Sequence, residues 1–207
     1  MFIVLEGIDS SGKKTQTNLL LKHLKQNGKK VEVLDFPTYD SPIGKLIKEQ
    51  LTGKLDAKYK VTPELAALMF AVDRYQHKDE LFEKIKKGKI LIANRYVQSN
   101  IGYQGARFEG EARNSFLNWI DEVESRLPQA DIVVYLDMPP EVARRLKSNR
   151  KKDVYELSLE YQKRVRDMYL HAAKKDDWIV INCTNGSKLR NPEEIHEEIW
   201  NKIKHKL

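Results

Sequence analysis

The sequence predicts an α/β fold in which helices flank a five-stranded parallel β-sheet. Five short runs rich in Val, Ile and Leu are spaced along the chain, helical patterns lie between them, and a glycine loop follows the first run directly. Runs that are apolar almost throughout are typical of strands covered on both faces, as in parallel sheets. Because ligands bind such sheets at the carboxyl ends of the strands, we expect the functional residues there.

The five expected strands are short and contain few polar residues. They are FIVLE at 2–6, VEVLDF at 31–36, ILIAN at 90–94, DIVVYLD at 131–137 and WIVINC at 178–183. Their alternation with helical segments makes each connection between parallel strands a right-handed crossover.

Two of the expected helices have clear boundaries. One follows the glycine loop and stops near Gln26, because Gly28 is a typical residue after a helix end. Another begins at Thr62-Pro63, a favoured N-cap followed by a favoured first helical residue, and runs to Lys87. The other expected helices cover roughly 110–125, 156–174 and 192–205.

The segment DFPTYDSPIG at 35–44 is expected to be a loop at the end of the second strand. Pro37 and Pro42 stiffen it, and Gly44 permits a close backbone approach. A role in substrate binding and a role as a plain connection are equally compatible with this composition.

Composition favours one soluble domain that spans residues 1–207. The chain contains 41% hydrophobic residues, has no run approaching the ~20 apolar residues of a membrane span, and begins without the features of a signal peptide. Its single cysteine, Cys183, excludes an internal disulfide and favours a reducing cytoplasm. The net charge of +7 suits nucleotides, nucleic acid or acidic lipid as partners, and it equally suits an ordinary lysine-rich surface.

The glycine loop from Gly7 to Lys13 has the pattern G-x-x-x-x-G-K of a phosphate-binding P-loop. A chain of this composition would contain that string by chance in about 6% of cases, so the string alone is weak. Its position between a buried strand and a helix is the context that supports a P-loop. Successive backbone N–H groups at a helix N-terminus then bind phosphate, and Lys13 reaches the β- and γ-phosphates.

Two further strand-end segments carry candidate binding residues. Arg95 follows the third strand and can form a bidentate contact with a phosphate, although it can also be a surface arginine. Phe70 and Arg74 share one face of the preceding helix, where one side chain can stack on a base and the other can read its edge. The alternative is that Phe70 is a core residue and that Arg74 pairs with a nearby acidic residue.

A basic segment at about 144–156 follows the fourth strand and contains SNRKKD. We expect it to be a lid that closes over a triphosphate and adds positive charge there, with a solvated charge run as the alternative.

Together these motifs resemble those of the thymidylate kinase family. The matching segments are LEGIDSSGKKTQ, FPTYDSPIG, LMFAVDRYQH, NRYVQSNIGYQGA and ADIVVYLDMPPE, in that order, and with the C-terminal helix they cover nearly the whole chain. The resemblance implies a P-loop kinase fold, a cytoplasmic homodimer, and transfer of the γ-phosphoryl group of ATP, bound with Mg²⁺, to dTMP. We expect neither a nucleic-acid partner nor a membrane partner.

The resemblance also assigns residues to ATP and to catalysis. The catalytic cations are Lys13, Arg95 and Arg150. The ATP-binding residues are Gly7, Ile8, Asp9, Ser10, Ser11, Gly12, Lys13, Lys14, Thr15, Arg144 and Arg145. The lid carries Arg150, Lys151 and Lys152 while the P-loop has an uncharged Ser10, which is similar to the family's lid-basic style.

For dTMP, the resemblance implies contacts with each part of the nucleotide. The residues are Asp9, Phe36, Tyr39, Phe70, Arg74, Arg95, Ser99, Tyr103, Gln104 and Tyr155. Asp9 would accept from the 3′-hydroxyl, Phe70 would stack on thymine and Arg74 would donate to its O4. Arg95 would bind the phosphate, and Ser99 and Gln104 would line the base pocket. Tyr103 would crowd the ribose 2′ position, and Tyr155 would complete the sugar pocket.

Four positions depart from the family pattern. Lys14 replaces the Ser or Thr that normally ligates Mg²⁺, Asn94 replaces an acidic residue, and Tyr39 replaces an arginine of the Phe-Pro loop. Leu146 stands at the adenine-stacking position. The metal ligands therefore stay open, with Glu6, Thr15 and Asn94 as candidates, directly or through water, and with Lys14 as a source of positive charge.

Two other functions compete with this interpretation. One is another nucleoside monophosphate or deoxynucleoside kinase on the same core. Arg74 can only donate hydrogen bonds, so it favours a base with a carbonyl at the edge it reads over cytosine, which has an amino group there. The other is a nucleotide-binding or nucleic-acid-binding module with reduced turnover. Nucleic-acid binding would fall steeply with salt, whereas dTMP binding would fall only modestly.

Overall fold

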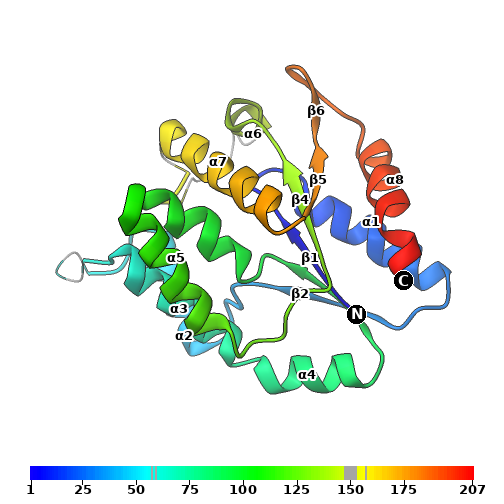
Figure 1. Cartoon of the computed structure of the whole chain (residues 1–207), viewed down its shortest axis with the longest axis horizontal. Helices are drawn as coiled ribbons and strands as arrows, with labels where there is room; N and C mark the ends of the chain where they lie inside the picture. The colour runs from blue at the N-terminus through cyan, green and yellow to red at the C-terminus, as the bar shows by residue number, and fades with distance from the viewer. Residues whose placement is uncertain (57, 59, 147–152, 157) are drawn as a thin grey trace.

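Five parallel strands form the centre of the molecule in a computed structural model that describes all residues except 57, 59, 147–152 and 157 (Figure 1). The strands are β1 (Phe2–Glu6), β2 (Val31–Asp35), β3 (Ile90–Asn94), β4 (Ile132–Asp137) and β5 (Ile179–Asn182). Their order across the sheet is β2-β3-β1-β4-β5, so the first strand of the chain is the central one. The predicted five-stranded parallel sheet is confirmed.

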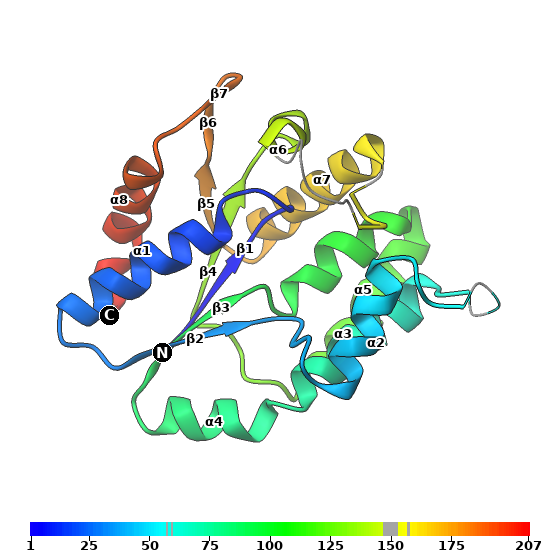
Figure 2. The same ribbon diagram turned by 180° about the vertical axis from the view of Figure 1, so that it is seen from behind.

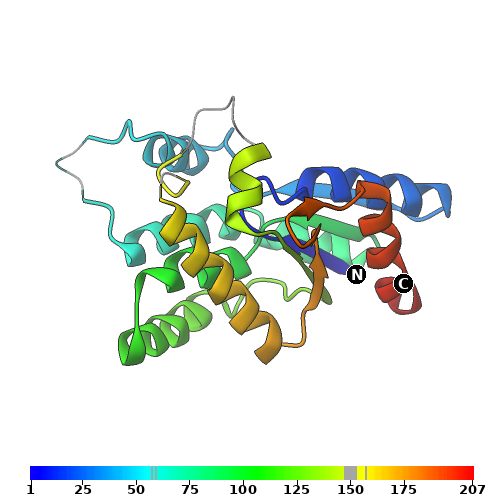
Figure 3. The same ribbon diagram turned by 90° about the horizontal axis from the view of Figure 1, so that it is seen from above.

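Helices cover both faces of this sheet, which explains why its strands are almost continuously apolar. The helices α1 (Lys13–Gln26) and α8 (Pro192–Ile203) lie on one face (Figure 2). The helices α4 (Lys78–Lys86) and α7 (Leu159–Lys175) lie on the other, and the view from above separates α1 from α7 across the sheet (Figure 3). The helices α2 (Pro42–Leu51), α3 (Pro63–Tyr75) and α5 (Gly110–Glu124) form a separate group beside the sheet.

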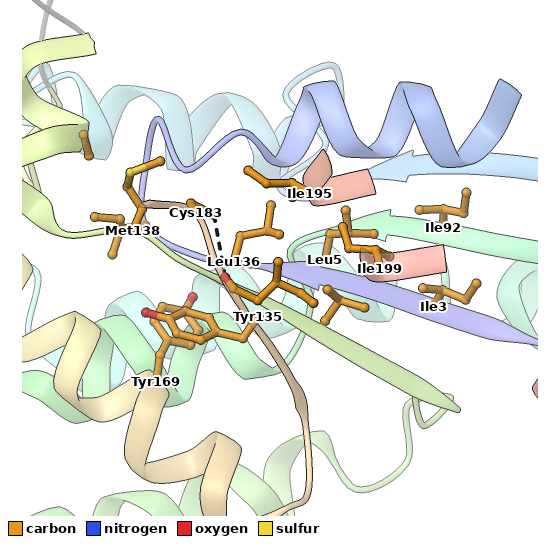
Figure 4. Packing of buried hydrophobic residues seen from close by; sticks show 14 of the residues in the cluster. Ile3, Leu5, Ile92, Tyr135, Leu136, Met138, Tyr169, Cys183, Ile195 and Ile199 are labelled. Atoms are coloured by element: carbon orange, nitrogen blue, oxygen red, sulfur yellow. Dashed lines mark hydrogen bonds between the residues drawn. The ribbon is translucent and has the colours of Figure 1, made fainter. Parts of the chain in front are cut away.

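The core consists of alternating strand residues packed against these helices (Figure 4). Ile3 and Leu5 of β1 point toward Ile195 and Ile199 of α8, and all four are buried. On the opposite face the rings of Tyr135 and Tyr169 stack with centroids 4.9 Å apart, which fastens α7 to β4. Each fully buried aliphatic side chain contributes roughly 1.5–3 kcal/mol, so these contacts hold the strand ends in place.

The predicted helix from 62 to 87 is wrong in one respect, because the structure divides it into α3 and α4. The separation falls at Gln76 and His77. The ring of His77 packs near that of Phe36, with centroids 5.8 Å apart, and the chain turns there so that Leu81 of α4 enters the core under β3. Tertiary packing thus overrides a helical pattern that continues through the turn.

The predicted loop at 35–44 is also partly wrong, because its last residues begin α2. Ser41 caps this helix, with its Oγ accepting from Gly44 N at 2.8 Å, and Pro42 is its first residue. A Cβ on Gly44 would lie 1.8 Å from the carbonyl oxygen of Thr38. The expected close backbone approach therefore exists, but it joins the loop to its own helix.

Several short elements were not predicted. They are α6 (Pro140–Leu146), the helical turns η1 (Asn100–Gln104), η2 (Gly105–Arg107) and η3 (Lys204–Lys206), and the hairpin of β6 (Thr184–Asn185) and β7 (Lys188–Leu189). Within the described part of the chain, no helix combines the length and apolar character needed to cross a membrane.

Candidate active site

The glycine loop joins β1 directly to α1, as the sequence predicts for a P-loop. Its backbone is left-handed at Ser10 (φ 62°) and at Gly12 (φ 91°), the N-cap of α1. At Gly7 a Cβ would lie 2.5 Å from Ser11 Oγ and 2.9 Å from the carbonyl of Leu136, so only glycine fits. The loop therefore presents backbone N–H groups at a helix N-terminus, the arrangement that binds phosphate.

Lys13 lies folded back over this loop. Its Nζ donates to the carbonyl oxygens of Gly7 and Ile8, both at 2.9 Å. Burial, followed by repulsion from Arg95, lowers the pKa of Lys13 from 10.5 to about 7, although Asp9 and Glu6 oppose that change. A polyphosphate beside Nζ would stabilise the charged form.

The residues after Lys13 are more exposed. Lys14 and Thr15 both lie at the surface of the first turn of α1, and the buried Ser11 Oγ has no hydrogen-bond partner among the described residues. A buried hydroxyl without a partner favours a ligand acceptor at this position.

Arg95 projects from the end of β3 toward the P-loop. Its backbone has a positive φ of 64°, an uncommon conformation for a residue with a large side chain, which is often found at functional sites. Its Nη2 donates to Asp9 Oδ1 at 2.9 Å and to the Tyr103 hydroxyl at 3.1 Å. The Tyr103 hydroxyl donates in turn to Asp9 Oδ2 at 3.1 Å.

The carboxylate of Glu6 lies behind the cluster of Arg95, Asp9 and Tyr103, and Glu6 is 0% exposed. It accepts from Tyr96 N at 2.8 Å, from Ser99 Oγ at 2.9 Å and from the Tyr169 hydroxyl at 2.8 Å. Arg95 Nη1 lies 4.0 Å from it. Glu6 therefore joins β1, the segment after β3 and α7 behind the arginine.

A pocket opens next to the P-loop, and it brings together most of the residues assigned to dTMP. Its lining consists of Asp9, Pro37, Tyr39, Leu51, Phe70, Arg95, Tyr103, Asp153 and Tyr155. Six of these nine, namely Asp9, Tyr39, Phe70, Arg95, Tyr103 and Tyr155, are residues that the sequence assigned to the substrate. Phe36 lies behind the pocket, where it packs near the rings of Tyr96 and His77, and its neighbour Pro37 lines the cavity instead.

Sequence reasoning missed three lining residues, of which Asp153 is the most informative. Burial, followed by repulsion from Asp9 and Glu156, raises the pKa of Asp153 from 3.8 to about 6. Its position as the acidic residue that ends the basic run SNRKKD was a usable signal. Pro37 was visible only as a loop residue, and Leu51 belongs to the unpredicted α2.

Arg74, which was expected to donate to the base, does not line this pocket. Its side chain is 2% exposed. Its Nε donates to Glu124 Oε1 at 2.8 Å, its Nη2 donates to the same atom, and its Nη1 donates to the Tyr96 carbonyl at 3.1 Å. Glu124 is fifty residues away in the sequence, on α5, so the pairing was not visible beforehand.

Ser99 and Gln104 also lie behind the pocket and do not line it. Ser99 belongs to the Glu6 network. Gln104 is fully buried and donates from Nε2 to the Tyr155 hydroxyl at 3.1 Å. The two residues therefore support pocket walls where a direct base contact was expected.

A second hollow flanks the other side of the P-loop. Its lining consists of Ile8, Asp9, Ser10, Pro140, Ala143, Arg144, Glu156, Leu159 and Gln162. Arg144 thus faces the P-loop as predicted, whereas Arg145 points to the β6–β7 hairpin and donates to the Ser187 carbonyl at 3.3 Å. Arg150, Lys151 and Lys152 of the expected lid lie outside the described residues.

The candidate metal ligands suit a magnesium ion that the protein contacts through water molecules. Both oxygens of Glu6 are occupied by protein donors. Asn94 accepts from Thr17 Oγ1 at 2.5 Å and donates to Asp35 Oδ1 at 2.5 Å. Thr15 is exposed. These residues fit an ion that keeps several waters and is bound mainly by nucleotide phosphates, as is usual for Mg²⁺.

Comparison with known proteins gives one consistent result. A family model described as thymidylate kinase matches residues 5–199. A probable thymidylate kinase of Pyrococcus abyssi is 35% identical, covering 100% of this chain and 97% of that protein. The thymidylate kinase of Plasmodium falciparum is 33% identical over 98% of this chain and 89% of its own length. Among solved structures, a thymidylate kinase from Candida albicans superimposes with a TM-score of 0.78 at 28% identity, covering 99% of this chain and 91% of that one.

Proposed function

The chain belongs to the thymidylate kinase family, and from this premise we propose that it transfers the γ-phosphoryl group of ATP to dTMP, giving dTDP and ADP. The single observation that carries the proposal is that two separate hollows meet at Asp9 of the P-loop. A transfer between two nucleotides needs two sites that share the phosphate-binding loop. We assign the hollow containing Phe70 and Arg95 to dTMP and the hollow containing Arg144 to ATP.

The proposed chemistry depends on positioning and charge, because the acceptor phosphate is already a nucleophile. Arg95 is the cation we assign to the dTMP phosphate, with Asp9 and Tyr103 fixing its guanidinium. Lys13 is the cation we assign to the transferred group, with its Nζ held at the loop carbonyls. Together they would offset the repulsion between two anions brought into line.

Magnesium would enter the site with ATP and neutralise part of the phosphate charge. This chain's own contribution is indirect, through Asn94, Glu6 and Thr15 around the loop. Lys14, exposed on the first turn of α1, replaces the usual hydroxyl ligand and supplies charge in its place.

Selectivity for thymine rests on fewer residues than the sequence suggested. Phe70 and Pro37 line the pocket, which supports stacking on a base. Arg74 pairs with Glu124 and does not line the pocket, so its contacts do not support a preference for dTMP over other monophosphates. Another nucleoside monophosphate kinase activity is therefore the second candidate function.

We also propose that the chain forms a homodimer in a reducing cytoplasm. Leu65, Leu68 and Val72 share one face of α3 and are 44%, 38% and 44% exposed. An apolar stripe of this kind is unusual on a monomer and fits a second copy of the same helix. The buried free thiol of Cys183 agrees with a reducing compartment.

The test of the proposed reaction is release of ADP from MgATP across a panel of nucleoside monophosphates. We expect dTMP to give the highest kcat/KM. Turnover of another monophosphate but not dTMP would establish the second candidate, and no turnover with any of them would overturn the enzyme assignment.

A matched pair of variants would test the site within that assay. Arg95→Gln removes a charged hydrogen-bond donor, and loss of about 1.5–3 kcal/mol would lower kcat/KM for dTMP on the order of 10–150-fold. Arg145→Gln is the control, because Arg145 points away from both hollows.

A further inference from the structure

One wall of the dTMP pocket is a loop that the structure fastens to α3. The loop after β2 contributes Pro37 and Tyr39 to the pocket, whereas Phe70, on the facing wall, belongs to α3. The distance between these two walls must be held if a base is to fit between them.

Asp73 makes the connection, one helical turn after Phe70. Its carboxylate is 1% exposed and accepts twice from one loop residue, from Thr38 N at 2.9 Å and from Thr38 Oγ1 at 2.6 Å. None of the ion pairs in the described part of the chain includes Asp73. A buried carboxylate that takes its hydrogen bonds from a loop backbone and a loop hydroxyl fixes the loop in both position and orientation.

Neighbouring groups complete the attachment. His77 Nε2 lies 3.2 Å from Thr38 Oγ1, and because the hydroxyl hydrogen goes to Asp73, the imidazole is the donor. Gln76 Nε2 reaches Ser41 Oγ at 3.3 Å and Asp73 Oδ1 at 3.4 Å. One face of the end of α3 and the turn after it therefore holds both ends of the segment from Thr38 to Ser41.

We propose that Asp73 and Thr38 are positioning residues that set the width of the dTMP pocket and thereby determine affinity for the acceptor nucleotide. This inference rests on the proposed function in assigning the pocket to dTMP. Neither side chain lines the pocket or the ATP hollow, so both act through Pro37 and Tyr39.

This positioning role predicts that substitutions that remove the Thr38 hydroxyl change the KM for dTMP but not the KM for ATP. Thr38→Val keeps the shape but removes the hydroxyl, which leaves Asp73 Oδ1 with only the longer contact from Gln76 Nε2 at 3.4 Å, whereas Thr38→Ser keeps the hydroxyl. We expect Thr38→Val to raise the KM for dTMP about 5–20-fold. The KM for ATP and kcat should stay within twofold, and Thr38→Ser should be close to wild type.

Asp73→Asn converts one of the two acceptors into a donor and should produce the same selective rise. Because both substitutions disrupt the same Asp73–Thr38 pair, the double variant should raise the KM for dTMP no more than the more strongly affected single variant does. Equal effects of Thr38→Val and Thr38→Ser, or parallel rises in the KM for dTMP and ATP, would overturn the proposal and indicate a general structural role.

Hydrogen exchange provides a readout that does not depend on the reaction. In Asp73→Asn, the amides of residues 36 and 38–41 should exchange at least about tenfold faster than in wild type, while amides in β1 are unchanged. If the wild type phosphorylates no monophosphate, the proposed function fails and this measurement still decides whether Asp73 holds the loop. Unchanged protection at 36 and 38–41 would refute the positioning role even in an active enzyme.

Discussion

Lys13 and Arg95 are two cations within one buried cluster, and their proximity affects how the site titrates. An arginine stays charged at all relevant pH values, so only the lysine can lose its proton and thereby reduce the repulsion between the two cations. Burial, followed by this repulsion, lowers the pKa of Lys13 to about 7, low enough for a substantial neutral fraction near neutral pH. A nucleotide phosphate adds negative charge at the same place and would restore the ammonium.

We therefore expect ATP binding to take up protons at pH 8 and much less at pH 6. At pH 8 Lys13 is largely neutral before binding, whereas at pH 6 it is already charged, so only the higher pH leaves a proton to be gained. Calorimetric titration in two buffers of different ionisation enthalpy measures the uptake. Lys14→Met should preserve it and Lys13→Met should abolish it. Equal uptake at both pH values would contradict this account.

The contacts of Arg74 show what residue-level prediction from sequence could not reach. Phe70 and Arg74 do share a helix register, but the contacts of the arginine depend on Glu124, which only the packing of α5 against α3 brings within reach. The positions of Lys13 and Arg95 beside the P-loop were predictable because each follows a strand whose carboxyl end lies at the same edge of a parallel sheet, whereas Tyr103 was assigned only through the family resemblance. A residue on a helix has no such constraint on which neighbour it meets.

Removing the arginine should mainly destabilise the fold. Burial raises the pKa of Glu124 and Arg74 opposes that rise, so Arg74→Ala leaves a carboxylate in the interior without its counter-ion. We expect a loss of about 3–5 kcal/mol in the free energy of unfolding, measured by urea denaturation, and recovery of most of it in Arg74→Met combined with Glu124→Leu. An unchanged free energy of unfolding with a raised KM for dTMP would instead restore the base-reading role.

At the scale of elements, the strands were predicted closely, whereas the segments around the pocket were not. Strand ends are visible because buried parallel strands are short and apolar. The short helix α2 begins with the recognisable signal Ser41-Pro42, but its ten residues contain too few turns for a clear period. The division of 62–87 into two helices depends on the contact of His77 with Phe36, which no local pattern reveals.

The junction between the loop and α2 makes a sharp prediction at this scale. Alanine is normally better than glycine within a helix by about 1 kcal/mol, but at Gly44 its Cβ would collide with the Thr38 carbonyl. Gly44→Ala should therefore destabilise the protein and raise the KM for dTMP, because the loop must move away from the pocket. Lys45→Ala, at an exposed position of the same helix, should be neutral or stabilising. A Gly44→Ala variant with wild-type stability and a wild-type KM for dTMP would show that the loop can move without affecting the pocket.

At the scale of the whole molecule, the sequence predicts the sheet but not everything that covers or extends it. Alternating strands and helices imply parallel pairing. The order β2-β3-β1-β4-β5 and the placement of α2, α3 and α5 as a separate group depend on contacts between distant segments. That group carries the apolar face that we assign to the dimer.

Leu68→Lys should convert the proposed homodimer into monomers. The lysine places charge in the middle of the Leu65, Leu68 and Val72 stripe, where burial against a second copy would leave it without a partner. Sedimentation velocity measures the change in mass. Leu146→Lys, which alters an exposed leucine on α6, is the matched control. A wild-type monomer at micromolar concentration, or a dimeric Leu68→Lys variant, would contradict the assignment of this face.

The central position of β1 also has a consequence for synthesis on the ribosome. β1 pairs on one side with β3 and on the other with β4, and neither partner exists until long after FIVLE has been made. At ~5–20 residues per second, on the order of 5–20 s pass before Asn94 completes the first partner. During that interval the nascent chain displays an apolar segment with both edges unpaired, which makes it a natural client for a chaperone at the exit tunnel.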